Sequence, residues 1–101
     1  MKHLEIHPEA DLEVREALSY YRANASEEIV RDFDERISLA ILEIGQHPER
    51  YPRWRRTYVR KFVLQRFHYL IFYLDYPEHI RVLAVAHTSR RPGYWKKRIS
   101  G

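Results

Sequence analysis

The stretch of residues 87–95 carries side chains that could act together on a phosphodiester. His87 has an imidazole that exchanges protons near neutral pH, and Arg90 has a guanidinium that can hold a phosphate through two hydrogen bonds. Tyr94 could donate a proton to a leaving group or stack on a base. Together they would supply a base, a charge stabiliser and an acid for attack by a 2′-hydroxyl without a metal. The same residue types also fit a structural role, in which His87 bonds to backbone at a strand end and Trp95 packs against a helix.

A second group of charged side chains lies between positions 50 and 61. Six cations occur there without a carboxylate, namely Arg50, Arg53, Arg55, Arg56, Arg60 and Lys61. They are interleaved with aromatic rings that can stack on unpaired bases, those of Tyr51, Trp54 and Tyr58. Guanidinium groups without local counter-charge favour the binding of phosphate or carboxylate. We therefore predict that an anionic partner, a polyanion or an acidic protein, binds through Arg53, Arg55, Arg56, Arg60, Lys61 and Trp95.

The alternative for this basic segment is internal neutralisation. Carboxylates from the first half of the chain would then pair with it in the fold, for example those of Asp32, Glu35 or Glu43.

Other chemistries find no support in the sequence. His3 and His7 share one face of a predicted strand, but no carboxylate or cysteine completes a recognised metal-binding spacing. The chain has no glycine-rich phosphate loop and no serine in a nucleophile-elbow context. We therefore predict neither a metal nor a cofactor.

Length and charge narrow the class of protein. The chain has 101 residues, 45% of them hydrophobic and 32% charged, so we expect a single domain over residues 1–101. Residues 1–46 hold 5 Lys/Arg and 11 Asp/Glu, whereas residues 47–101 hold 13 Lys/Arg and 3 Asp/Glu. The C-terminal half is therefore strongly basic. The absence of cysteine, of a signal peptide and of a membrane-spanning apolar run predicts a cytoplasmic protein without membrane contact.

Hydrophobic periodicity predicts an α+β fold with the element order β-αα-βββ. A short strand over residues 4–7 precedes a helix that starts at Pro8, and a second helix begins at Asn24 or Ser26 and ends at Gly45. Their short connection predicts an antiparallel helical hairpin. Alternation predicts a strand over 57–64, a run that is apolar on both faces predicts a central strand over 68–75, and a third strand follows over 80–87. Short turns join them into an antiparallel sheet that the N-terminal strand and the hairpin pack against. Residues 88–101 are expected to form a polar tail.

Several short motifs occur in order along nearly the entire chain. They are HPEA at 7–10, EA at 16–17, YY at 20–21, HP at 47–48, YP at 51–52, RKF at 60–62, FHYLIFY at 67–73, VLAVAH at 82–87, Arg90 and YW at 94–95. In this order they resemble the RelE/ParE superfamily of bacterial type II toxin–antitoxin toxins, especially the ParE-like plasmid-stabilisation branch.

The resemblance implies a small basic toxin that inhibits growth and is neutralised by a cognate antitoxin. The antitoxin would wrap its C-terminal segment across the sheet and the helical hairpin, and an oligomer would form through it. ParE-like relatives inhibit DNA gyrase, whereas RelE-like relatives cut mRNA in the ribosomal A site.

The residues that match RelE-like nucleases form an incomplete set. Arg90 and Tyr94 fall where those nucleases carry an arginine and a late tyrosine, and Lys61 falls near a basic strand position. Leu70 and Val63 stand where they carry a further arginine and a second lysine. The resemblance therefore favours gyrase or another target over mRNA cleavage. The alternatives are a metal-independent, ribosome-dependent endoribonuclease and a non-toxic basic module that binds RNA or an acidic protein.

Overall fold

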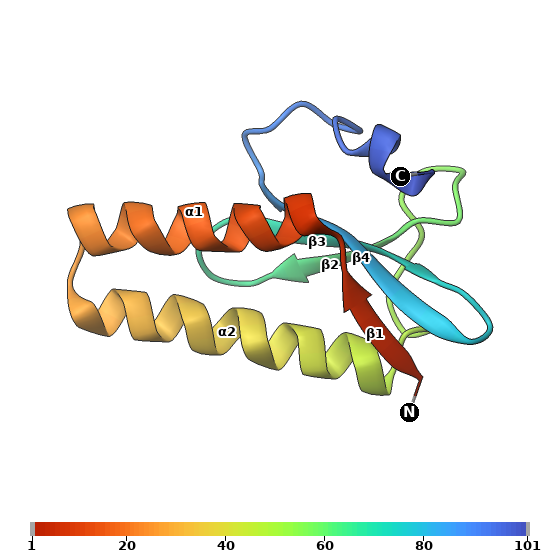
Figure 1. Ribbon diagram of the computed structural model, residues 1–101, viewed down its shortest axis with the longest axis horizontal. Helices are drawn as coiled ribbons and strands as arrows, with labels where there is room; N and C mark the ends of the chain where they lie inside the picture. The colour runs from red at the N-terminus through yellow and green to blue at the C-terminus, as the bar shows by residue number, and fades with distance from the viewer. Residues whose placement is uncertain (1, 101) are drawn as a thin grey trace.

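In the computed structural model, which describes residues 2–100, two helices lie across one face of a four-stranded sheet (Figure 1). The elements in chain order are β1 (His3–Ile6), α1 (Pro8–Asn24), α2 (Glu27–Gln46), β2 (Arg60–Leu64), β3 (Tyr69–Asp75), β4 (His79–His87) and the 3₁₀ turn η1 (Lys96–Ile99). This confirms the predicted α+β class and the order β-αα-βββ. Met1 and Gly101, which the predicted domain and tail include, lie outside the described residues.

Local side-chain chemistry sets where the two helices begin. At α1, His7 Nδ1 accepts a hydrogen bond from the Glu9 backbone N–H at 3.0 Å, and Pro8 takes the first helical position, where no N–H is needed. At α2, Ser26 Oγ accepts from the Ile29 N–H at 3.3 Å. The connection is so short that the helices form the predicted antiparallel hairpin (Figure 1).

The strands are ordered β1-β4-β3-β2. β2, β3 and β4 pair antiparallel as predicted, and β1 joins the other side of β4 in parallel, with His3 opposite His79. β2 starts at Arg60 rather than at Thr57, because residues 57–59 belong to a turn. The Thr57 hydroxyl donates to the Trp54 carbonyl at 2.7 Å and accepts from the Val59 N–H at 3.1 Å.

The sheet is buried on both faces. The helices cover one face, where Phe33 and Ile44 of α2 meet Ile71 and Tyr73 of β3. The second face holds another core, with Phe72, Leu74, Leu83 and Ala84 among its buried residues. Leu83 and Ala84 are adjacent yet share this core, because the β3–β4 register shifts at Phe72/Tyr73 and the extra residue interrupts the alternation.

The tail that follows β4 is not the polar extension that we predicted. It folds back over the second face, and Trp95 is 1% exposed, with its ring centroid 4.8 Å from that of Phe72 and 5.0 Å from that of Trp54. Gly93 allows this approach, since its φ is +77° and a Cβ there would lie 3.3 Å from the Trp54 ring. The tail packs here because the helices leave this apolar face uncovered.

Burial leaves Trp95, which we predicted to take part in partner binding, very little surface to offer. Its ring is 1% exposed and fills the second core. The structural role considered for Trp95 in the sequence analysis was packing against a helix, but the ring packs against the sheet.

Candidate functional site

A small hollow of about 130 Å³ lies where β4 gives way to the tail, and we call it the C-terminal hollow. Its floor is aromatic, made by the buried rings of Trp54, Phe72 and Trp95. Around it stand His87, Tyr94 and four cations, which are Arg55, Lys61, Arg90 and Arg91. No lining residue is acidic. The fold thus brings the predicted catalytic residues together with two cations of the basic segment.

The basic segment is left almost without counter-charge. Glu43 pairs with Arg50 and accepts from the Tyr51 hydroxyl at 2.6 Å, but Asp32 pairs with Arg36 and Arg66 instead. Among the described residues, none of the other five cations of the segment forms an ion pair with a carboxylate. Neutralisation of the basic segment by carboxylates of the helices, the alternative considered above, therefore applies to Arg50 only.

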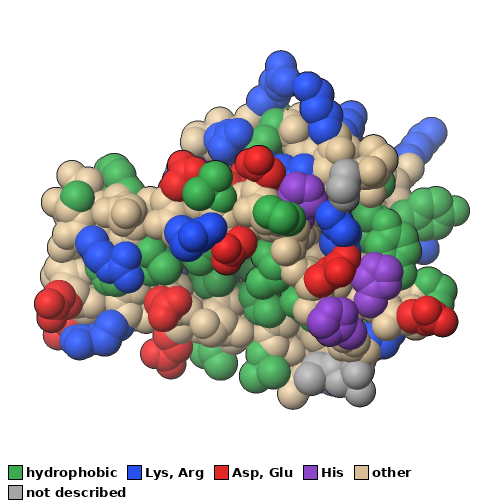
Figure 2. All heavy atoms as spheres, in the orientation of Figure 1, with side chains coloured by type: hydrophobic (Ala, Val, Ile, Leu, Met, Phe, Trp, Pro, Cys, Tyr) green, Lys and Arg blue, Asp and Glu red, His purple; other side chains and the backbone are tan. Residues whose placement is uncertain are grey.

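Charge is also unevenly distributed over the surface. Figure 2 shows Lys and Arg side chains projecting at the top of the view, over the tail, whereas Asp and Glu side chains on this face are scattered over the helices, among further Lys and Arg side chains, and at the right-hand side of the view. A surface of this kind attracts an anionic partner to the tail and its surroundings.

Ser89 holds the His87 ring in one tautomer. Its Nδ1 accepts from the Ser89 backbone N–H at 3.1 Å and lies 2.8 Å from the Ser89 hydroxyl, so the proton of the neutral ring sits on Nε2 by inference from these partners. A general base needs a ring nitrogen with a free lone pair. In this tautomer Nε2 carries the proton and the lone pair of Nδ1 accepts from the Ser89 N–H, which favours binding an anion over removing a proton.

Arg90 and Tyr94 form one stacked unit. The Arg90 guanidinium carbon lies 3.9 Å from the Tyr94 ring centroid, and Arg90 Nη1 lies 3.9 Å from Glu13 Oε2. The Tyr94 hydroxyl donates to Glu13 Oε2. Burial, and then the hydrogen bond to the Glu13 carboxylate, raise the pKa of Tyr94 above its usual range. Proton donation by Tyr94 is therefore disfavoured at neutral pH, and its ring supports Arg90.

Glu13 is the residue of this site that the sequence analysis missed. Its Oε1 accepts from Arg98 Nη1 at 2.9 Å and from the Val85 N–H at 3.0 Å, and its Oε2 accepts from Arg98 Nη2 at 3.1 Å. These bonds tie α1 and β4 to the tail. Glu13 lies three residues after Ala10 and four before Ala17, which are both buried, so it belongs to the face of α1 that is turned toward the protein. That spacing was the available signal.

The remaining predicted binding residues lie elsewhere. Arg53, Arg56 and Arg60 line a larger pocket of about 610 Å³, which we call the loop pocket, between residues 53–60 and the β3–β4 turn. Arg60 Nη1 donates to the Tyr51 carbonyl at 2.6 Å, and the Arg53 guanidinium carbon lies 5.1 Å from the Tyr58 ring centroid. The predicted binding set is therefore divided between two sites.

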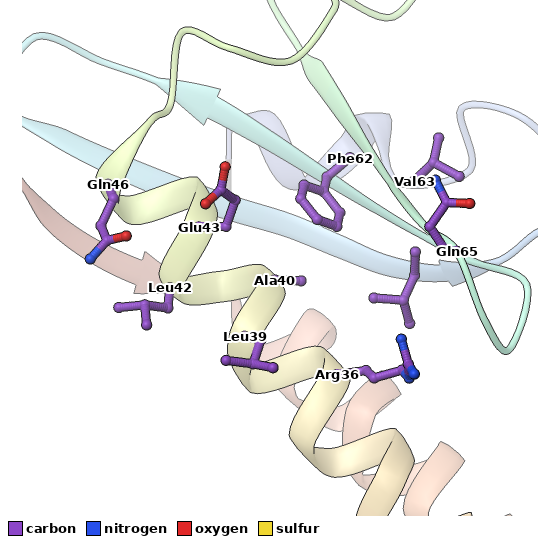
Figure 3. Close-up of a pocket in the computed structure, with 10 residues that line it drawn as sticks. Arg36, Leu39, Ala40, Leu42, Glu43, Gln46, Phe62, Val63 and Gln65 are labelled. Atoms are coloured by element: carbon purple, nitrogen blue, oxygen red, sulfur yellow. The ribbon is translucent and has the colours of Figure 1, made fainter.

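A third concave surface, the α2–β2 groove, has a volume of about 380 Å³ and is lined by apolar side chains together with Arg36, Glu43, Gln46 and Gln65. Figure 3 shows Ala40 on the side of α2 that faces Phe62 of β2, whereas Leu42 points away from β2. Leu39, Leu42 and Val63 are large apolar side chains exposed there to solvent. Exposed apolar patches of this kind mark surfaces for protein partners.

The described residues contain no metal-binding group and no spanning helix. No cluster of three or more His, Cys, Asp or Glu side chains within residues 2–100 could hold a metal ion. Over the same residues, neither helix has the length and apolar character to cross a membrane.

Fold and site together define a small basic α+β protein with a cation-rimmed hollow at the end of its last antiparallel strand. A solved structure described as the chromosomal ParDE TA system from P. aeruginosa shares the fold, with a TM-score of 0.76 at 15% identity, over 88% of this chain and 98% of that chain. The family model described as the ParE toxin of the type II toxin–antitoxin system, parDE, matches residues 4–92 of this chain. The chain belongs to the ParE toxin family. Comparison with curated protein sequences gave no match.

Proposed function

We propose that this protein is a growth-inhibiting toxin that a cognate antitoxin neutralises and that binds its target, DNA gyrase or another protein, at the C-terminal hollow. The supporting observation is the group of cations around the hollow, which has no acidic residue in its lining. Within residues 2–100 only Arg90 among them has a carboxylate nearby, that of Glu13 at 3.9 Å. Cations without counter-charge repel one another and destabilise the fold, so binding of an anionic group would account for the retention of Arg55, Lys61 and Arg91. Either intracellular target would place the protein in the cytoplasm.

Binding is favoured over catalysis by the hydrogen bonds inside the site. Nδ1 of His87 is occupied by the Ser89 N–H, and the Tyr94 hydroxyl is committed to Glu13. Neither residue is set up for proton transfer. Leu70 lines the hollow at a position where RelE-like nucleases would carry an arginine, which further weakens a phosphodiester site.

The second candidate function is ribosome-dependent mRNA cleavage without a metal. It is supported by one observation, that His87, Arg90 and Tyr94 line the same hollow although they were selected from the sequence alone. In this reading the tautomer of His87 would change when RNA binds.

Expression of the chain alone in a bacterium tests the proposal. We expect growth arrest that is relieved by co-expression of a small acidic antitoxin encoded next to it. The purified protein should then inhibit supercoiling by gyrase and leave ribosome-bound mRNA intact; cleavage of that mRNA would establish the second candidate instead. Harmless expression at a verified protein level would favour the non-toxic binding module.

The antitoxin contact is expected to include residues 53–61. Reversing charge at Arg56 and Arg60 together should weaken the toxin–antitoxin complex several-fold and reduce its dependence on salt, because close charge pairs govern association and selectivity. Titration calorimetry over a salt series measures both. Reversal of Arg22 and Arg31, two exposed arginines on the helices, is the matched control.

An affinity that stays the same at every salt concentration in the Arg56/Arg60 variant would exclude this contact. The α2–β2 groove would then be the surface to test, since its exposed leucines offer an apolar alternative.

A further inference from the structure

The loop pocket has features that neither toxicity nor the C-terminal hollow explains. The pocket has a volume of about 610 Å³ and an apolar interior, to which Val59 and Leu74 contribute buried side chains. Its walls include two large apolar side chains that remain in solvent, Tyr58 at 77% and Ile99 at 42% exposed. A pocket of this size and character accommodates bulky apolar groups.

The rim of the same pocket is positively charged. Arg53, Arg56 and Arg60 line it, and none of the three has an ion pair within residues 2–100. The one lining carboxylate, Asp75, is already paired with Lys2. Arg53 and Arg60 are cross-strand neighbours, and Arg56 lies in the turn between them. Three cations on one rim can pair with several carboxylates of one peptide.

We infer that the loop pocket is a docking site for an acidic peptide segment that inserts one bulky apolar side chain between Leu74 and Ile99. The carboxylates of the segment pair with Arg53, Arg56 and Arg60, and its apolar side chain covers surface that Tyr58 and Ile99 now expose. The inference rests on the proposed function in one respect only, that the antitoxin supplies this segment. The aliphatic interior formed by Val59, Leu74 and Ile99 favours the peptide. Nucleic acid, whose bases could stack on Tyr58, is the competing occupant that the experiment distinguishes.

Fluorescence anisotropy with two labelled peptides tests the docking site on the full chain. Each peptide has twelve residues rich in glutamate, and they differ only in a central leucine or serine. We expect the leucine peptide to bind about tenfold more tightly, since burial of a leucine side chain adds this much to affinity. Ile99→Asp and Tyr58→Ser should each reduce that preference, and Arg56→Glu should weaken both peptides, while Arg31→Glu on α2 changes neither.

Equal binding of the two peptides, or a leucine preference that both pocket variants retain, would overturn the inference. So would tighter binding of a thymidine oligonucleotide that competes with the peptides and is weakened by Arg56→Glu. Thermal unfolding of each variant checks that the fold is kept. Ile99 belongs to η1, so Tyr58→Ser, which lies outside η1, keeps the test valid if Ile99→Asp disturbs that turn. Neither toxicity nor an antitoxin enters this measurement, so its failure leaves the proposed function standing. Conversely, harmless expression in the bacterium would leave the peptide result standing.

Discussion

Arg90→Ala is expected to abolish growth arrest while leaving the fold intact. The Arg90 side chain is half exposed, borders the C-terminal hollow and stacks on the Tyr94 ring, so it can meet a target without reorganising the core. Loss of a central interface arginine from a gyrase inhibitor would cost on the order of 2 kcal/mol, about thirtyfold in affinity. For a nuclease, loss of the cation that stabilises phosphate charge would cost on the order of 10² to 10³ in rate. Growth after induction, at matched protein levels, is the measurement.

Two further substitutions separate binding from chemistry at this site. His87→Gln and Tyr94→Phe would both damage proton transfer but largely preserve size, and Phe keeps the stacking surface beneath Arg90. We expect mild loss of toxicity from both, because the hydrogen bonds of these residues favour a binding role. Strong loss in both would instead support the nuclease.

The matched control for Arg90 is Lys97→Ala, which removes an exposed cation of the tail outside the lining of the hollow. If Arg90→Ala stays fully toxic, the toxic site lies elsewhere, and Arg60 and Lys61 would be the next positions to replace.

Glu13→Ala is expected to lower the free energy of unfolding by about 3 kcal/mol, the largest stability effect that we predict. The side chains of Glu13 and Arg98 are each only 13% exposed, so alanine would leave the guanidinium without its carboxylate and the Val85 N–H without its acceptor. Urea denaturation followed by circular dichroism measures the change. Glu16→Ala, at an exposed position of the same helix, should change stability by less than about 0.5 kcal/mol.

A double-mutant cycle shows whether Glu13 acts through Arg98. The double variant Glu13→Ala/Arg98→Ala should lose clearly less stability than the sum of the single variants, since no buried charge is left unpaired. Strict additivity would mean that the pair does not hold the tail, and the geometry around Glu13 would need another explanation.

Local patterns in the sequence determined the elements and their order. Apolar residues three and four apart predicted α1 and α2, and the apolar runs over 68–75 and 80–87 predicted β3 and β4 to within one residue at each end. Pro8 marked the start of the first helix. These signals are local because helix and strand periodicities depend on neighbours a few residues apart. The motifs carried by these elements were also enough for the resemblance to the RelE/ParE superfamily, which the family match confirms.

Contacts between distant residues were decided by the tertiary structure alone. The sequence of the tail is mostly polar, yet its Trp95 is buried against the second face of the sheet. The tail packs there because the helices leave this apolar face uncovered, which no local pattern in the tail sequence indicates. The basic segment is continuous in sequence but divides between the C-terminal hollow, with Arg55 and Lys61, and the loop pocket, with Arg56 and Arg60. Successive residues of a strand or turn point in different directions, so adjacency in sequence does not place side chains in one site.

Glu13 illustrates the same limit for a single residue. The sequence determined that a carboxylate stands between two buried alanines of α1, but its partners, Arg98 and Tyr94, lie more than 80 positions away. Only the folding of the tail across the sheet brings them together. The carboxylate tolerates this partly buried position because a guanidinium, a hydroxyl and a backbone N–H satisfy it there, a condition that depends on three separate elements being in place.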